Sequence, residues 1–213
     1  MDNEIVCPDK YGSFNMSDLT FSEPKPSYSG GQCVYVNYKQ HSKLRIQSPP
    51  IYAPFGISTN KKGKKYIKLS LNDNTFKQFI AKIDDHVTST GVSKSVDWFK
   101  KELSADAVKD MYVRSWEVGN PAYPPNMFMN YPTQNDEFTG EIYDVNNKEV
   151  SEKVIKEKTR LQVVVDLIGI YFKPKEMRLS WKLVQIKVLP PAPAKGFAFK
   201  LRNEEEDSDN EPA

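Results

Sequence analysis

The feature that most constrains the fold is a pair of apolar segments near the C-terminal end of the sequence. Residues 161–172 are apolar on both faces of an extended chain, which is typical of a central strand. A turn at 173–175 leads into a second segment, 179–189, so the two predict a long antiparallel hairpin. In the second segment the apolar positions change parity between Leu183 and Val184. That change predicts a β-bulge, at which the sheet bends toward a barrel.

The rest of the chain predicts shorter strands, two helices and a loop. Strands are expected at five segments of β-rich or alternating composition: 32–39, 43–47, 64–71, 111–118 and 138–145. The main helix follows a cap at Asp73 or Asn74, because apolar residues then recur at helical spacing: Phe76, Phe79, Ile80, Ile83 and Val87. A shorter helix is expected over 95–103, burying Val96, Phe99 and Leu103. Residues 119–134, rich in Pro, Asn and aromatic side chains, predict a long loop.

We expect three parts along the chain. Residues 1–30 are polar and turn-rich and form an N-terminal arm, residues 31–200 form one domain, and residues 201–213 form a disordered acidic tail. The predicted fold class is α+β, a mainly antiparallel curled sheet with one main inserted helix. Phe197 and Phe199 stand just before the acidic residues, where their rings would anchor the tail on the body or on a partner.

The net charge of +2 conceals an uneven distribution. Residues 203–213 contain six of the 28 acidic residues and none of the 30 basic ones, so the rest of the chain carries a net charge of +8. A basic body is the electrostatic footprint of a nucleic-acid-binding protein. The acidic tail either serves solubility or competes with nucleic acid for the same cations.

Catalytic and metal-binding signatures are missing from the sequence. The two cysteines and two histidines are not clustered, and no phosphate-binding loop or nucleophile motif occurs. We therefore expect no enzyme, no cofactor and no metal site. The few cysteines, the acidic N-terminus and the lack of a long apolar run favour an intracellular protein without a membrane segment.

Strand alternation gathers cations and tyrosines on the faces opposite the apolar side chains. If the strands 32–39, 43–47 and 64–71 are neighbours, the cations on this face would hold phosphates and the rings would stack bases. A basic turn precedes the third strand. The expected nucleic-acid-binding residues are Tyr35, Lys43, Arg45, Lys61, Lys62, Lys64, Lys65, Tyr66 and Lys68. The same side chains also suit an ordinary solvated strand face, which is the alternative interpretation.

Tyr123, Phe128 and Tyr131 of the predicted loop leave three alternatives open. They could form a stacking clamp, a segment that docks a partner, or a loop whose rings pack on its own body.

Three stretches together resemble a protein family of nucleocytoplasmic large DNA viruses that includes single-stranded-DNA-binding proteins. They are residues 44–58 (LRIQSPPIYAPFGIS), residues 138–145 (FTGEIYDV), and the pair 163–172 (VVVDLIGIYF) and 179–188 (LSWKLVQIKV). The resemblance implies an OB-like barrel and binding of single-stranded DNA, without catalysis. Its general plan, with an inserted helix and an acidic C-terminal tail, is also similar to that of phage replication single-strand binders.

Together these observations predict sequence-independent binding of single-stranded DNA, with RNA as an alternative ligand, in viral DNA replication or repair. The acidic tail would modulate binding and recruit replication proteins. The expected location is the viral factory in the host cytoplasm or the virion, and homo-oligomerisation stays open. The alternative function is that of a structural or scaffolding protein of the virion or viral assembly site.

Overall fold

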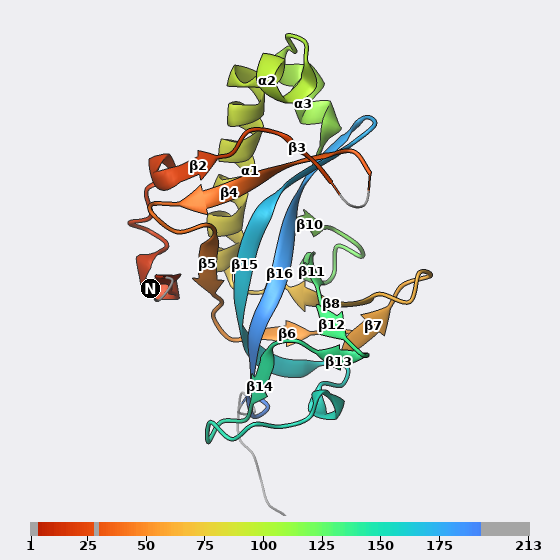
Figure 1. Cartoon of the computed structure of the whole chain (residues 1–213). Coiled ribbons are helices and arrows are strands. Elements are labelled where there is room, and N and C mark those ends of the chain that lie inside the picture. The colour runs from red at the N-terminus through yellow and green to blue at the C-terminus, as the bar shows by residue number, and fades with distance from the viewer. Residues whose placement is uncertain (1–3, 28–29, 193–213) are drawn as a thin grey trace, which may run out of the picture.

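The computed structural model describes residues 4–27 and 30–192 and shows an α+β fold made mostly of strands (Figure 1). Two long antiparallel strands, β15 (Thr159–Lys173) and β16 (Glu176–Val188), run through the molecule and confirm the predicted hairpin. Helices gather at one end of this hairpin and a barrel-like sheet at the other (Figure 1). The predicted acidic tail, 201–213, lies outside the described residues, as do Phe197 and Phe199.

The central hairpin contains the bulge that the sequence predicts. Val184 has no partner in the ladder, because the flanking residues Leu183 and Gln185 pair with consecutive residues of β15. A second irregularity lies between Leu167 and Gly169 of β15. Since bulges bend and twist a strand, the same hairpin can enter the barrel at one end and pack beneath the helices at the other.

Five strands close a ring at the barrel end. β6 (Ile51–Ala53) pairs with β15 and with β8 (Lys65–Ser70), β8 pairs with β11 (Asn126–Asn130), and β11 pairs with β16, which returns to β15. β7 (Ile57–Thr59) and β14 (Glu141–Tyr143) extend the sheet along β8 and β16. Closure of the ring pairs the backbone groups that an open sheet would leave at its edges.

Beyond the point where β6 leaves β15, other strands become its neighbours. β5 (Leu44–Gln47) and then β4 (Gln32–Tyr38) pair with successive parts of β15. Gly169 permits the close approach of β4, because a Cβ atom there would lie 2.4 Å from the carbonyl oxygen of Val34. The described part of the predicted arm pairs with β5 and β4 through three short strands: β1 (Ile5–Val6), β2 (Leu19–Phe21) and β3 (Lys25–Pro26).

The main helix, α1 (Asn74–Ser93), begins where the sequence predicts. Asp73 is its N-cap, and the carboxylate accepts a hydrogen bond from the backbone N–H of Phe76 at 2.8 Å. α1 packs beside β5 and β15, and its apolar side is buried against them (Figure 1).

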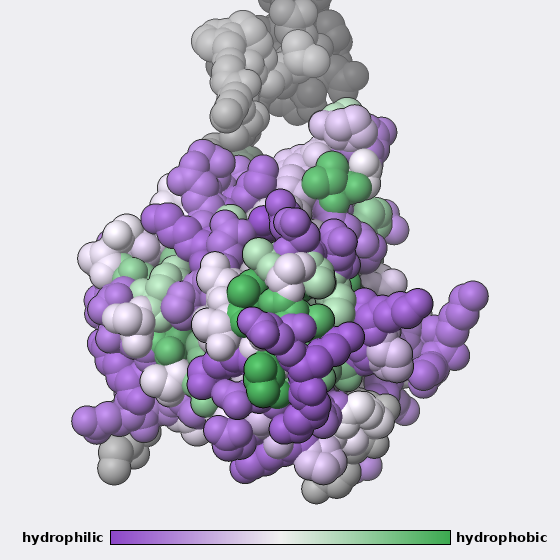
Figure 2. Space-filling model, turned by 90° about the horizontal axis from the view of Figure 1, so that it is seen from above, coloured by the Kyte–Doolittle hydropathy of each residue, from purple (hydrophilic) through white to green (hydrophobic). Residues whose placement is uncertain are grey.

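Two short helices follow α1: α2 (Ser95–Phe99) and α3 (Ala105–Met111). The sequence predicts that Val96 is buried, but it is 60% exposed, because the short α2 directs Trp98 into the core instead. Seen from the end that carries these helices, the surface is mainly hydrophilic with a small apolar patch, a common composition for a protein surface (Figure 2).

Several segments differ from the sequence prediction. The predicted helix 95–103 ends at Phe99, and of the predicted strand 138–145 only Phe138 and β14 lie in strands. Residues 111–118 do not form one strand, because α3 extends to Met111 and only β9 (Tyr112–Val113) and β10 (Trp116–Glu117) follow. Residues 119–134 are not one long loop, because they contain β11, whose Met127 and Met129 are buried. The surrounding prolines and asparagines conceal this short alternation. A separate hairpin completes the strands: β12 (Thr133–Gln134) and β13 (Glu137–Phe138).

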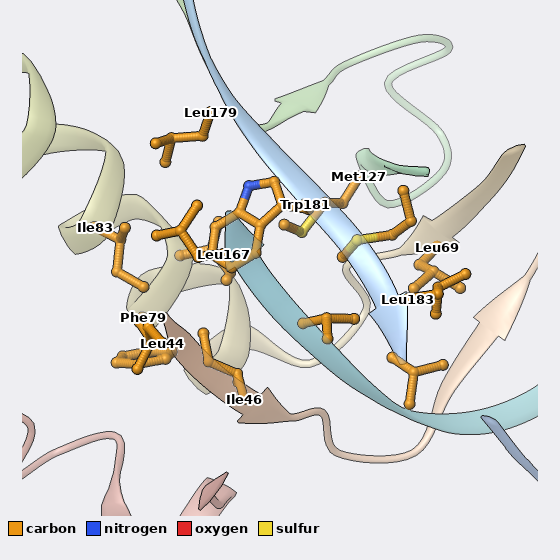
Figure 3. Close-up of a cluster of buried hydrophobic side chains, with 14 of the residues drawn as sticks. Leu44, Ile46, Leu69, Phe79, Ile83, Met127, Leu167, Leu179, Trp181 and Leu183 are labelled. Carbon is orange, nitrogen blue, oxygen red and sulfur yellow. The ribbon is translucent and has the colours of Figure 1, made fainter. Parts of the chain in front are cut away.

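The buried core is continuous from the helical end to the barrel (Figure 3). Phe79 and Ile83 of α1 lie on the same side of the hairpin as Leu44 and Leu167 (Figure 3). Further along β16, the core passes to side chains that fill the barrel: Leu69, Met127, Trp181 and Leu183 (Figure 3). The hairpin therefore supplies both halves of the core, which fixes the barrel relative to α1.

A buried polar contact also joins the two ends. The Asp84 carboxylate of α1 accepts hydrogen bonds from the hydroxyls of Tyr112 and Ser115, each at 2.6 Å. Burial raises the pKa of Asp84, although these hydrogen bonds act against that shift. The Ser115 hydroxyl in turn accepts a hydrogen bond from the Trp181 indole at 2.9 Å, so this contact holds α1 to the β9–β10 segment and to β16.

Candidate nucleic-acid interface

Side chains that point away from the core form a continuous outer face on five adjoining strands, β5, β15, β16, β11 and β8. Directly paired residues of neighbouring strands point to the same side of a sheet. The paired residues that cross this face are Arg45, Asp166, Lys182, Asn130 and Tyr66, in that order, and we name them the outer row. Since neighbouring strands lie about 4.8 Å apart, the outer row follows the outside of the sheet for about 19 Å.

An aromatic pair stands at the β8 end of the outer row. The rings of Tyr66 and Phe128 are stacked, with centroids 5.0 Å apart and an angle of 26° between their planes. Phe128 is 44% exposed, while Met127 and Met129 on either side of it are buried. The ring is thus held by a strand and still open to solvent, an arrangement that can stack on a nucleic-acid base.

The turn between β7 and β8 carries three lysines, Lys61, Lys62 and Lys64, which we name the lysine turn. The Asn60 side chain holds the turn by accepting hydrogen bonds from the backbone N–H groups of Lys62 at 2.9 Å and Lys64 at 3.0 Å. Gly63 provides the left-handed conformation that the turn requires, with φ of 75°. All three lysines are exposed, and none forms an ion pair within the described residues. The turn projects from the barrel (Figure 1).

Lys43 and Arg45 are held by Asp166 of β15. Arg45 binds both carboxylate oxygens, at 2.7 and 3.0 Å, and the Lys43 ammonium lies 2.8 Å from one of them. Burial by itself raises the pKa of Asp166, but hydrogen bonds from the two cations outweigh it and keep this pKa below its usual value. Part of the positive charge predicted for this region therefore neutralises a buried carboxylate.

Lys65 and Lys68 of β8 also have acidic partners. The Lys65 ammonium lies 2.6 Å from a carboxylate oxygen of Glu152 and 2.8 Å from the carbonyl oxygen of Asp136. Lys68 forms an ion pair with Glu117, whose side chain is 63% exposed. An ion pair with such an exposed carboxylate contributes little stability, so Lys68 can exchange Glu117 for a phosphate more readily than Lys65 can exchange Glu152.

Tyr35 lies on the same outer face but far from Tyr66 along it. It is 39% exposed, and the Lys25 ammonium stands 5.9 Å from its ring centroid. Tyr35 pairs with Gly169, which pairs with Ser180, two residues from Lys182 on β16. β8 is therefore no direct neighbour of β4 or β5. β15, β16 and β11 stand between them and join the predicted residues into one face.

Four residues of this face are absent from the sequence prediction of the site: Phe128, Asn130, Asp166 and Lys182. Lys182 is exposed at the centre of the outer row and forms no ion pair within the described residues. Its signal was the alternation of 179–183, in which Trp181 and Leu183 are apolar and Lys182 is not. The sequence signal for Asp166 was its position as an acidic residue within an apolar strand. A buried carboxylate at such a position needs a cationic partner.

Residues 4–27 and 30–192 contain neither a metal-binding cluster nor a membrane-spanning helix. No group of three or more His, Cys, Asp or Glu side chains in this part of the chain is arranged to hold a metal ion. No helix of this part combines the length and apolar character needed to cross a membrane.

Comparison with solved structures finds phage proteins of similar size. The single-stranded DNA-binding protein from bacteriophage Enc34 has 12% sequence identity and a TM-score of 0.48, over 88% of this chain and 96% of the phage chain. The single-stranded DNA-binding protein gp2.5 of bacteriophage T7 has 12% identity and a TM-score of 0.47, over 80% of this chain and 100% of the phage chain. Similarity at this level does not extend a function to this chain.

Comparison of sequences finds a viral relative and a family. The uncharacterized protein L291 of Acanthamoeba polyphaga mimivirus is 23% identical over an alignment of 171 residues that covers 73% of this chain. The match covers 28% of that relative, so this chain corresponds to less than a third of its length. Residues 58–199, more than half of the chain, match the model of DUF5871, described as a family of unknown function. The chain therefore belongs to the DUF5871 family.

Proposed function

We propose that this protein binds single-stranded DNA, without preference for sequence, on the outer face of an OB-like barrel. The observation that carries the proposal is the stacked Tyr66–Phe128 pair, whose Phe128 ring is exposed, at one end of a row that also holds Lys182, a cation with no ion pair among the described residues. In this proposal the two rings stack bases, and Lys182 and the lysine turn hold phosphates. A role in viral DNA replication or repair would follow from such binding.

The chemistry of the face suits a single strand because unstacked bases present their flat faces to aromatic side chains. Base–aromatic stacking contributes roughly 1–3 kcal/mol per base and hardly depends on base identity. The outer row of about 19 Å, with a cation at its centre and the lysine turn beyond its β8 end, is long enough to contact several nucleotides of a single strand. Sequence independence follows because stacking and phosphate contacts do not read the base edges.

The other predicted residues receive more specific roles in the proposal. Lys43 and Arg45 chiefly orient Asp166, and contribute only their residual charge to DNA. Lys65 fixes the start of β8 through Glu152. Lys68 contacts DNA when its exposed partner Glu117 is displaced. Tyr35, on the next row, would stack a base only of a strand that continues past β16 onto β15 and β4.

The acidic residues 204–211 modulate binding in this proposal by competing with DNA for the same cations. The competition is electrostatic, so it is strongest at low salt and weakens as ions screen both interactions.

The test of the proposed function is a fluorescence-anisotropy titration of a labelled oligothymidine with the full chain, at about 50 and about 200 mM salt. We expect binding that weakens steeply as salt rises, and tighter low-salt binding by a 1–202 truncation that lacks the acidic residues. An oligouridine of the same length measures the preference between DNA and RNA. No binding of oligothymidine at micromolar protein and low salt would contradict the proposal and favour a structural protein of the virion or assembly site.

A further inference from the structure

A pocket opens at the barrel end of the molecule, away from α1, α2 and α3, and a 3-10 helix, Glu152–Val154, forms part of its wall. Its volume is about 420 Å³, which is within the range of pockets that accept ligands. The apolar part of its wall comes from Phe138, Ile142 and Val150. Phe138 is stacked on the buried ring of Tyr131, with centroids 4.4 Å apart, so this side of the wall is firmly supported. The pocket can therefore accept an apolar side chain without rearrangement of the barrel.

The polar part of the pocket is mostly acidic. Glu137 and Glu149 are exposed and form no ion pair within the described residues. Glu152 is occupied, since it accepts hydrogen bonds from the Lys65 ammonium at 2.6 Å and the Tyr131 hydroxyl at 2.9 Å. Burial raises the pKa of Glu152, but these hydrogen bonds outweigh it and keep the group ionised. Lys153 is the one basic residue of the lining. An apolar wall with two carboxylates that have no ion pair among the described residues fits a ligand that carries both rings and positive charge.

We propose that residues 195–202 of the same chain, KGFAFKLR, occupy this pocket. This segment contains the rings of Phe197 and Phe199 among three cations, Lys195, Lys200 and Arg202. Its chemistry complements the pocket in both respects. Burial of one phenylalanine side chain contributes about 1.5–3 kcal/mol, which is enough to hold a tethered segment.

The position of the chain end favours this occupant. β16 pairs with β14 at its last residues, where Lys187 is the partner of Tyr143, and β14 contributes Ile142 to the pocket. The structure describes the chain to Ala192, and the five residues from there to Phe197 span at most about 18 Å when extended. The two phenylalanines can therefore reach the pocket of their own chain.

Docking would also position the acidic residues that follow the segment. The effect of this position on DNA binding rests on the proposed function. Glu152 of the pocket contacts Lys65, and Lys65 directly follows the lysine turn in sequence. Residues 204–211 would then begin close to the lysine turn and compete with DNA at a high effective concentration. The docked segment is thus the anchor of the competing tail.

The test is zero-length carbodiimide crosslinking of the full chain, followed by mass spectrometry of the monomer fraction. We expect amide bonds from Lys195 or Lys200 to Glu137 or Glu149. The crosslink between Lys65 and Glu152, whose charged atoms are 2.6 Å apart, serves as an internal control. In the F197S/F199S variant the tail crosslinks should fall at least about tenfold while the control crosslink persists, because the lysines remain but the apolar anchor is gone.

The remaining outcomes overturn the proposal. Tail crosslinks that are absent, that are unchanged in F197S/F199S, or that occur only in covalent dimers would exclude docking within one chain. Because no DNA is present, this failure is separate from a failure of the proposed function. If docking alone is wrong, F197S/F199S and the wild-type chain bind oligothymidine with the same affinity. If docking is right, F197S/F199S binds more tightly at low salt.

Discussion

The two ends of the outer face carry similar charge but use it differently. On β5, Lys43 and Arg45 surround the buried carboxylate of Asp166, which is 1% exposed. At the other end, the lysine turn and the Phe128 ring are exposed, and the three lysines have no acidic partners among the described residues. The first arrangement stabilises the fold, whereas the second is available to a ligand. A count of the cations on a strand face therefore overestimates the positive charge that is available to bind phosphate.

The largest expected effect comes from reversing the charge of the lysine turn. The K61E/K62E/K64E variant should bind oligothymidine about 100-fold more weakly at low salt, because three phosphate contacts become repulsive. The slope of log affinity against log salt should become shallower by about 2, at about 0.7 per phosphate of a single strand. Anisotropy titrations over a salt series measure both quantities.

The matched control for the lysine turn is K82E/K101E/K109E, which changes the net charge equally at exposed lysines of α1, of the α2–α3 connection and of α3. It should lose much less affinity than K61E/K62E/K64E. Equal losses in the two variants would mean that only the net charge of the protein matters, and would remove the distinction between the two ends.

The next effect concerns stability at the β5 end. D166N should lower the free energy of unfolding at pH 7 by about 2 kcal/mol, because the two cations lose their buried carboxylate. The pKa of Asp166 is lowered in the folded state, so its contribution is complete above the unfolded pKa of about 4 and is lost as the pH falls below it. Urea unfolding at pH 7, 5 and 3.5 should show the difference between wild type and D166N shrinking only at the lowest pH. A difference that is the same at all three would contradict this assignment.

Removal of the exposed ring should have a moderate effect on binding. F128A should weaken oligothymidine binding about tenfold, since one stacked base contributes roughly 1–3 kcal/mol. The loss should depend little on salt, unlike that of the lysine variant. F55A is the control, because Phe55 is 54% exposed but lies in the turn between β6 and β7, off the five strands that carry the outer row. Comparable losses in F128A and F55A would argue against stacking on Phe128.

The smallest effect is expected for a cation that is already paired. K43A should weaken DNA binding by less than about threefold, because Lys43 is engaged by Asp166 and adds little net charge at the surface. A loss as large as that of the lysine variant, in the same anisotropy assay, would show that the β5 end is the principal site.

Local features of this fold were predictable from the sequence. The hairpin of β15 and β16, the bulge at Val184 and the cap at Asp73 each follow from neighbouring residues: apolar parity in the strands and a side-chain acceptor before the helix. The ring closure was not predictable in detail. It depends on β11, a five-residue strand between proline-rich segments, and on pairings between residues distant in sequence.

The same limit applies to the candidate site. Alternation correctly separates Tyr66 from Ile67 and Arg45 from Ile46, because it is a property of a single strand. It does not reveal that Asp166 holds Arg45, or that Phe128 lies on Tyr66, because those contacts depend on which strands are adjacent. Whether a cation is free to bind a ligand thus depends on its neighbours in the tertiary structure, which a single sequence does not reveal.

The most direct test of the central claim is ultraviolet crosslinking of oligothymidine to the full chain, with the crosslinked residues mapped by mass spectrometry. Binding on the outer face predicts crosslinks at Phe128 or Tyr66, which disappear when unlabelled oligothymidine is added in excess. Specific crosslinks confined to other parts of the molecule, such as the helical end around α2 and α3, would contradict the account.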